Sequence, residues 1–268
     1  MAIDVSVQSA ALSVSTVAGA VVVVPVAPML AEPHVSSGQV SQQLGGHVVA
    51  IVEDRGDWLL VRGGDEYEGW MHRGYLGRSR DAVEDPSPRV SLGCVVRGAD
   101  GCRRSLPLRA VLVAGDRVED GEAVRRTELN ARFPTNAAAI VRTATERFVG
   151  TSYQWGGVTP WGADCSGLVQ SVFALHGVSL PRDAWQQARV GRDAGRDMLG
   201  ARIADLLFFS DRPDGHITHV AIAAGDGRIV HLALGRGGYA VECLDDDRDE
   251  YVGKLRARFL FARRVVPV

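Results

Sequence analysis

The sequence places a cysteine where a helix is expected to begin. In "DCSGLVQSVFALHG" (164–177), apolar residues recur at helical spacing and Gly177 follows as a stop signal. Asp164 is a suitable N-cap, so Cys165 falls in the first turn, where unpaired N–H groups and the helix dipole favour an anion. A thiol there can have a lowered pKa, and the small Ser166 leaves it accessible. A lone cysteine at this point could equally be a small buried apolar side chain.

Two histidines on a predicted hairpin offer a base and an orienting group. "HVAIAAGDGRIVHLA" (219–233) predicts two strands joined by a turn at 225–227. In that register His219 and His231 share one face of the hairpin, offset diagonally, with backbones about 7–8 Å apart. A thiol, a base and an orienting group form an activated-nucleophile arrangement. The histidines could instead bind a metal, but the hairpin has no Asp or Glu at ligand spacing and Cys165 would have to join, so we expect none.

The elements that must position these residues belong to a C-terminal α+β unit. "FPTNAAAIVRTATERFVG" (133–150) predicts a helix capped by Asn136, the cysteine segment predicts a second helix, and "LPRDAWQQARVG" (180–191) begins a third. Strands are predicted over 205–210, 218–225, 228–235 and 256–266. Helices therefore come first and strands afterwards, which is an α+β arrangement.

The chain before this unit is predicted to be all-β. Short apolar runs between residues 18 and 80 alternate with Gly, Asp and Arg turns, as in a small barrel. The piece "GDWLLVRGGDEYEGWMHRGYL" (56–76) resembles the hairpin of bacterial SH3-like domains. A polar linker, "DAVEDPSPR", then leads into a second, degenerate barrel. The predicted division is an arm and first barrel over 1–80, a second barrel and linker over 81–130, and the α+β unit over 131–268.

Composition and charge exclude several classes of partner. The formal net charge of -2 lacks the basic excess that nucleic-acid and membrane-surface binders need. The four cysteines are scattered without a CxxC pair and are expected to be reduced thiols. No basic residue precedes Arg55, and the apolar run within 15–33 is too short to span a bilayer. We therefore expect a cytoplasmic monomer, with a non-standard export route left open.

Several motifs, in order, resemble one family. "YQWGGVTPWGADCSGLVQSVFALHGVSLPRDAWQQ" (153–187), "DLLFF" (205–209) and the histidine hairpin are similar to the NlpC family of cell-wall cysteine peptidases. The resemblance implies a papain-like core that cleaves peptidoglycan stem peptides without a cofactor. The layout further resembles a subgroup with two N-terminal SH3-like domains. That subgroup hydrolyses the bond from γ-D-Glu to a diamino acid (diaminopimelate or lysine) in short peptides with a free N-terminal L-Ala.

The resemblance assigns catalytic roles to individual residues. Cys165 would be the nucleophile, His219 the general base and His231 the polar third member. The hydroxyl of Tyr153 would help the backbone N–H of Cys165 to hold the oxyanion. Trp155 would line the cleft, although a structural role for this tryptophan is equally compatible with the sequence.

The resemblance also assigns the substrate contacts. A preference for a free amine needs a carboxylate at the closed end of the cleft, because a blocked N-terminus would leave that charge buried and unpaired. Asp183 matches the family position, and Glu68 in the first barrel is a second candidate. Asp164 and Ser166 would position the D-Glu residue, and Arg182 would contact its α-carboxylate. Glu68 and Arg182 could also be solvated surface charges.

These features together predict a cytoplasmic cysteine endopeptidase that recycles murein fragments. Its expected partner is the stem peptide L-Ala-γ-D-Glu-diamino acid, cleaved through a thioester on Cys165. One departure from relatives is Ala184, where serine often follows the Arg-Asp pair and could bond the substrate. Two alternatives stay open: an N-acetylmuramoyl-L-alanine amidase or acyltransferase on the same scaffold, and a non-catalytic peptidoglycan-binding module.

Overall fold

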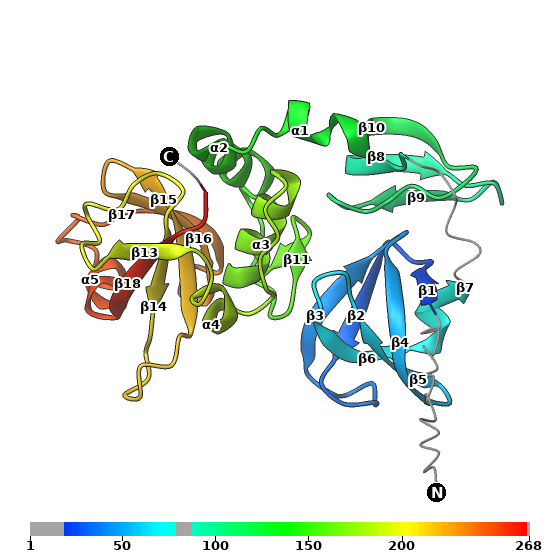
Figure 1. The fold of residues 1–268 in the computed structure, drawn as a ribbon, viewed down its shortest axis with the longest axis horizontal. Coiled ribbons are helices and arrows are strands. Elements are labelled where there is room, and N and C mark those ends of the chain that lie inside the picture. The colour runs from blue at the N-terminus through cyan, green and yellow to red at the C-terminus, as the bar shows by residue number, and fades with distance from the viewer. Residues whose placement is uncertain (1–18, 79–86, 267–268) are drawn as a thin grey trace, which may run out of the picture.

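Three units follow one another along the chain in a computed structural model that describes residues 19–78 and 87–266 (Figure 1). The first two units are all-β and the third is α+β. The expected N-terminal arm, and most of the linker expected over 81–89, lie outside the described residues. None of the helices in the described part of the chain is long and apolar enough to cross a membrane.

The first unit is a seven-stranded sheet rolled around its own apolar core. The strands pair in the order β3-β2-β6-β5-β4-β1-β7. Alternate residues point inward, so that Met29, Val49, Leu59, Val61 and Met71 are buried together. The strands are β1 (Gly19–Val22), β2 (Val26–Leu30), β3 (Gln39–Leu44), β4 (Val48–Arg55), β5 (Trp58–Arg62), β6 (Glu68–His72) and β7 (Leu76–Arg78).

Strand β3 was not predicted because its sequence, QVSQQL, is too polar. The structure shows why: this strand faces the C-terminal unit, and Ser41 and Gln42 are buried there. Gln42 Oε1 accepts a hydrogen bond from the Val158 N–H at 3.1 Å, and Gln39 Nε2 donates one to the Trp155 carbonyl at 2.8 Å. These amides therefore bind backbone groups of the C-terminal unit that lie against β3.

The second unit is a smaller, three-stranded sheet with β8 in the middle. Its strands are β8 (Arg89–Arg97), β9 (Arg103–Leu106) and β10 (Arg117–Arg125). A shared apolar cluster, including Leu44, Val96, Leu106 and Val158, joins all three units. Arg109 adds a polar link, because its Nη1 donates to Ser171 Oγ in the C-terminal unit at 2.8 Å.

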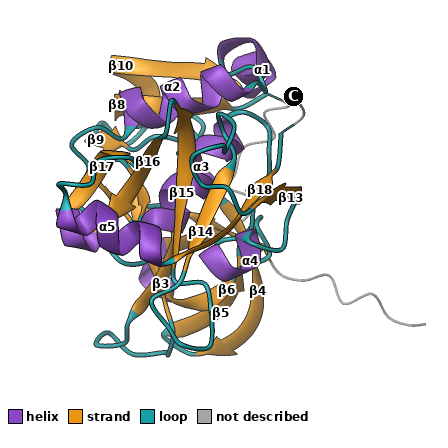
Figure 2. Cartoon of the chain, turned by 90° about the vertical axis from the view of Figure 1, so that its left-hand side faces the viewer, coloured by secondary structure: helices purple, strands orange, loops and turns teal. Residues whose placement is uncertain are grey.

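The C-terminal unit packs helices against one antiparallel sheet of order β13-β18-β14-β15-β16-β17 (Figure 2). Helices α2 (Ala137–Arg147) and α3 (Cys165–Leu175) pack on each other and on β15 and β16, burying Ile140, Leu168 and Phe173. The strands are β11 (Val158–Thr159), β12 (Gly162–Ala163), β13 (Arg192–Gly195), β14 (Leu206–Phe209), β15 (His219–Gly225), β16 (Arg228–Ala233), β17 (Gly238–Cys243) and β18 (Phe259–Arg264).

Helices α2 and α3 precede the strands of the six-stranded sheet as predicted, but the short pair β11-β12 comes before α3, and a further helix lies between β17 and β18. Asn136 caps α2 by accepting a hydrogen bond from the Ala139 N–H at 2.9 Å. The third helix is a single turn, α4 (Ala184–Gln187). The segment predicted as a strand over 256–266 begins inside helix α5 (Glu250–Ala257), because Asp249 caps an α-helix there.

A glycine controls the contact between the first barrel and the C-terminal unit. Gly156 has φ +74°, and a Cβ there would come as close as 2.9 Å to Gln39 of β3. Gly150 also has a positive φ of +79°, but a Cβ there would meet nothing within 4 Å. These two glycines are therefore a matched pair, since only one of them is also constrained by the barrel.

We expect Gly150→Ala to cost about 1–2 kcal/mol of unfolding free energy from backbone strain alone. Gly156→Ala should cost more and should also expose the segments between the units to protease. Differential scanning calorimetry and limited proteolysis measure both effects. Equal losses of stability with equal protease resistance would show that the contact does not depend on Gly156.

Candidate active site

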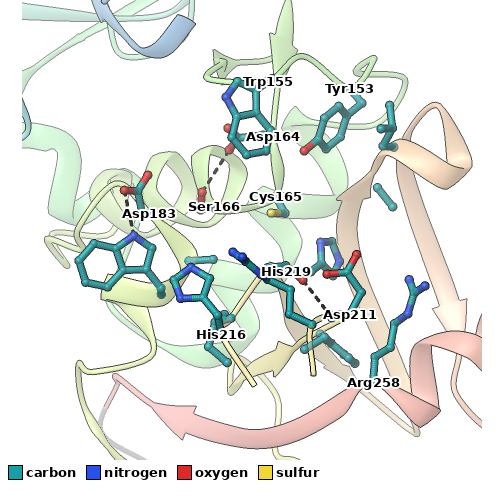
Figure 3. A pocket seen from close by; sticks show the side chains of 18 of the residues that line it. Tyr153, Trp155, Asp164, Cys165, Ser166, Asp183, Asp211, His216, His219 and Arg258 are labelled. Carbon is teal, nitrogen blue, oxygen red and sulfur yellow. Dashed lines mark hydrogen bonds between the residues drawn. The ribbon is translucent and has the colours of Figure 1, made fainter. Parts of the chain in front are cut away.

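A cavity of about 660 Å³ lies between the first barrel and the C-terminal unit (Figure 3). The barrel contributes Val40 and Tyr67 to its wall. Among the predicted site residues, those that line it are Tyr153, Trp155, Asp164, Cys165, Ser166, Asp183 and His219. The other three, His231, Glu68 and Arg182, lie outside the wall.

Asp164 fixes the start of α3 as the sequence predicts. Its Oδ1 accepts from the Gly167 N–H at 2.7 Å, and its Oδ2 accepts from the Gly156 N–H at 2.8 Å. Cys165 therefore stands in the first helical turn with only 6% of its surface exposed. Helix α3 packs directly on β15, the strand that carries His219. The predicted nucleophile and the predicted base therefore stand on two elements that pack together.

A buried arginine binds the Asp164 carboxylate. Arg182 Nη2 donates to Asp164 Oδ2 at 2.7 Å and Nη1 donates to Oδ1 at 3.1 Å. The guanidinium also donates to Ser166 Oγ at 2.9 Å and to Ser41 Oγ at 3.2 Å. With 1% of its side chain exposed, Arg182 does not reach the cavity. Both sequence interpretations, a substrate contact and a solvated charge, are wrong because internal partners use its donors.

The two hairpin histidines meet as the register predicts. Strands β15 and β16 pair Ile222 with Val230, which places positions 219 and 231 on one face. His219 Nε2 lies 2.8 Å from His231 Nδ1. His231 is fully buried behind His219, and Figure 3 shows His219 at the centre of the cavity wall together with Cys165.

Sequence reasoning missed a carboxylate behind this pair. Glu242 Oε1 lies 3.4 Å from His231 Nε2, and Arg236 donates to the two oxygens of Glu242 at 2.7 and 2.9 Å. Glu242 stands on β17, a strand that the sequence analysis did not predict. The pairing register of β16 and β17 brings Glu242 to this position. His231 pairs with Ala240, and residue 242 lies on the same face of the sheet as residue 240.

Asp183 lies at one end of the cavity with a tyrosine from the first barrel. The Tyr67 hydroxyl donates to both oxygens of Asp183 at 3.3 Å, and Trp185 Nε1 donates to Oδ2 at 3.2 Å. Figure 3 shows this carboxylate beside the start of α3, on the side away from Tyr153. The structure thus places Asp183 where the sequence predicts a carboxylate.

The prediction that Glu68 faces the cleft is wrong. Its carboxylate forms an exposed ion pair with Arg62 on the neighbouring strand at 2.6 Å. Adjacent strand residues point to opposite faces, and it is the preceding Tyr67 that lines the cavity. The sequence therefore indicates the correct hairpin but the wrong residue, since Tyr67 and not Glu68 faces the cavity.

Tyr153 and Trp155 form the wall beside the cysteine. The Tyr153 N–H donates to the Gly237 carbonyl at 3.0 Å, which fixes the backbone at this point. In Figure 3 the Tyr153 hydroxyl is turned towards the start of α3. Burial raises the pKa of Tyr153, so its hydroxyl keeps the proton and remains a donor. Trp155 is 69% exposed, so it lines the cavity rather than filling a core.

Comparison with known proteins identifies both kinds of unit. Residues 150–248 match the NlpC/P60 family, and residues 26–77 match the bacterial SH3 domain. The chain is a cysteine peptidase with an NlpC/P60 domain and a bacterial SH3 domain. The predicted resemblance to the NlpC family and the predicted α+β fold class are confirmed. Of the two predicted SH3-like barrels, only the first matches the bacterial SH3 domain, and the second unit is a three-stranded sheet.

Relatives of this NlpC/P60 peptidase share most of its length. It is 28% identical to a γ-D-glutamyl-L-lysine dipeptidyl-peptidase of Bacillus cereus, over 85% of this chain and 75% of the relative. It is 28% identical to dipeptidyl-peptidase 6 of Lysinibacillus sphaericus, over 87% of this chain and 94% of the relative. The crystal structure of an NlpC/P60 family protein from Bacillus cereus matches with a TM-score of 0.75 at 21% identity, covering 93% of this chain and 100% of that one.

Burial sets the charge state of the peptidase's reacting pair. Burial raises the pKa of the Cys165 thiol, and the nearby charge of Asp164 raises it further. Burial also lowers the pKa of His219, and the neighbouring His231 adds to this effect. Both groups are therefore neutral near pH 7. The predicted lowering of the thiol pKa is wrong for the resting protein, because desolvation outweighs the N–H groups at the helix start.

Alkylation by iodoacetamide measures this charge state. Because thiol and imidazole are neutral at rest, the alkylation rate of Cys165 should keep rising about tenfold per pH unit above neutrality. Mass spectrometry of the peptide containing residue 165 separates this signal from the exposed Cys102 and Cys243. A rate that is already constant between about pH 5 and 8 would reveal a thiolate–imidazolium pair and contradict this assignment.

Proposed function

We propose that this peptidase hydrolyses the bond between γ-D-Glu and a diamino acid in peptidoglycan stem peptides that begin with a free L-Ala. The observation that carries the proposal is the Asp183 carboxylate, which shares one cavity with Cys165. An extended dipeptide spans roughly 7 Å, so an amine held by Asp183 would bring the next residue's carbonyl towards the sulfur. The similarity to γ-D-glutamyl-L-lysine dipeptidyl-peptidases supports the choice of bond.

The first barrel supports recognition of a free amine. Asp183 is half-buried, and the hydroxyl of Tyr67 bonds its carboxylate. Burial raises the pKa of Tyr67 to about 12, so this hydroxyl is neutral and forms no ion pair with the carboxylate. An ammonium group would form such a pair, whereas an acylated nitrogen would not. Val40 and Tyr67 also stand where a sugar-linked N-terminus would extend, which favours the peptidase over an amidase.

The proposed reaction is acyl transfer to sulfur. As Cys165 attacks the γ-carbonyl, His219 accepts the thiol proton, and the Cys165 N–H with the Tyr153 hydroxyl stabilises the oxyanion. The tetrahedral intermediate expels the diamino acid as an amine that His219 protonates, which leaves a thioester. His219 then deprotonates a water molecule, which releases the L-Ala-D-Glu dipeptide. The neutral resting pair suits this sequence because the proton moves together with the attack.

The proposed setting is the recycling of murein fragments by a cytoplasmic monomer. The reason is chemical: the amine of L-Ala becomes free only after its bond to the glycan has been cut. A site that requires this amine therefore acts on released peptides and follows an amidase-type reaction. Ala184 lines the cavity beside Asp183 where relatives often have serine, so the backbone and Asp183 must hold this part of the substrate without that hydroxyl.

The nucleophile assignment is tested by Cys165→Ala. This variant should fold like the wild type, with an unchanged circular dichroism spectrum, because only one sulfur atom is lost. Turnover of L-Ala-γ-D-Glu-diaminopimelate, followed by chromatography of the released dipeptide, should be abolished. Remaining cleavage at a comparable rate would refute the mechanism.

The amine site is tested by pairing Asp183→Asn with Glu68→Gln. Losing the Asp183 charge should cost about 2 kcal/mol or more of substrate binding, which corresponds to a roughly 30-fold higher KM for the free-amine peptide. The wild type should cleave the free-amine peptide and reject the N-acetylated one. In Asp183→Asn the difference in KM between the two peptides should be smaller. Glu68→Gln removes a carboxylate outside the cavity and should leave KM unchanged. Equal effects of both substitutions would contradict the assignment.

A further inference from the structure

We propose that Glu242, held by Arg236, is a positioning residue that determines which nitrogen of His219 is bare and can accept the thiol proton of Cys165. The inference rests on the proposed roles of Cys165 and His219, and it adds two residues to which the sequence analysis assigned no role. The observation behind it is a continuous row of hydrogen-bonding groups that starts at a buried carboxylate and ends at the base.

The row begins at Glu242, whose side chain is 7% exposed. Arg236 Nε donates to Oε1 at 2.7 Å and Arg236 Nη2 donates to Oε2 at 2.9 Å. Although burial raises the pKa of Glu242, these bonds and the bond from His231 lower it to about 2, so the group is a carboxylate. A carboxylate can only accept hydrogen bonds. His231 Nε2, at 3.4 Å, must therefore carry a hydrogen.

The tautomer of His219 follows from that of His231. With a single hydrogen, on Nε2, His231 has a bare Nδ1, which can only accept. His219 Nε2 lies 2.8 Å from this nitrogen and must therefore donate. Neutral His219 then has its bare nitrogen at Nδ1, which His231 does not use. Nδ1 is thus left free to accept the thiol proton of Cys165.

Other groups hold Arg236 in place against Glu242, and we call this ion pair of Arg236 and Glu242 the clamp. Arg236 also donates to Asp249, and its guanidinium lies 4.4 Å above the centre of the Tyr251 ring. Leu234 and Gly235, just before Arg236, line the cavity. The clamp therefore joins the rim of the cavity to the carboxylate that fixes the tautomers. When His219 accepts the thiol proton, the same negative charge stabilises the imidazolium through His231.

The tautomers can be read directly in the folded wild-type enzyme. Long-range ¹H–¹⁵N NMR, with signals assigned by single His→Gln variants, should show His219 and His231 both protonated at Nε2 and bare at Nδ1. A hydrogen on Nδ1 of His231 would overturn the proposal. Since no substrate is present, this result is independent of whether the protein cleaves the proposed peptide.

Glu242→Gln tests the consequence for catalysis. The amide cannot accept at both of its end atoms, so His231 should lose its single tautomer and show a second set of ¹⁵N shifts. We expect kcat to fall roughly 10²-fold, within the contribution of a positioned general base, while KM stays within about twofold. An unchanged kcat with unchanged ¹⁵N shifts would overturn the proposal.

Asp205→Asn is the matched control for this substitution. Asp205 is fully buried and Arg264 binds both of its oxygens at 2.6 Å, but it does not line the cavity. It should lose stability, as Glu242→Gln does, yet keep kcat and the histidine shifts of the wild type. If Asp205→Asn reproduced the fall in kcat and the shift changes, Glu242 would be merely structural and the proposal would fail.

Discussion

The buried ion pair between Asp164 and Arg182 is the interaction on which the active site depends. The Asp164 carboxylate caps α3 and accepts a hydrogen bond from the Gly156 N–H. The Arg182 guanidinium donates to Ser166 in α3 and to Ser41 in the first barrel. One pair therefore holds the cysteine-bearing helix, the cleft loop and the barrel strand together. Leaving either charge buried without its partner typically costs about 3–5 kcal/mol, so the pair also fixes the position of these elements.

The same pair explains how a barrel takes part in a peptidase site. Asp183 follows Arg182 directly in sequence, so the arginine that is fixed against β3 also places the next carboxylate in the cavity. The barrel then supplies Tyr67 as a hydrogen-bond partner for that carboxylate. In the proposed reaction, substrate selection comes from contacts between units, whereas bond cleavage comes from one helix start and one hairpin of the C-terminal unit.

Local signals in the sequence predict the reacting groups well. Asp164 as an N-cap and the shared face of His219 and His231 follow from helix and hairpin geometry, and the structure shows both. Long-range polar pairing is what the sequence does not show. Arg182 reads as a substrate ligand until its partner eighteen residues away is known. Strand β3 and Glu242 were missed because their polar side chains pair with another unit or another strand.

The pKa of Cys165 was wrongly predicted for a related reason. A helix start favours a thiolate, but that effect is judged from the local sequence, whereas desolvation depends on everything packed around the sulfur. A neutral thiol beside a neutral imidazole can still react, provided that the imidazole presents a bare nitrogen and the substrate is held in place. In the proposed mechanism the buried Glu242 meets the first condition and the half-buried Asp183 meets the second.

The central claim is that Cys165 carries the substrate's acyl group, delivered by a peptide whose amine the cavity binds. Rapid acid quench of the enzyme with L-Ala-γ-D-Glu-diaminopimelate, followed by mass spectrometry of its peptides, tests this directly. The account predicts a transient L-Ala-γ-D-Glu adduct on the peptide containing residue 165. Steady turnover with no such adduct, or an adduct at another cysteine, would contradict it.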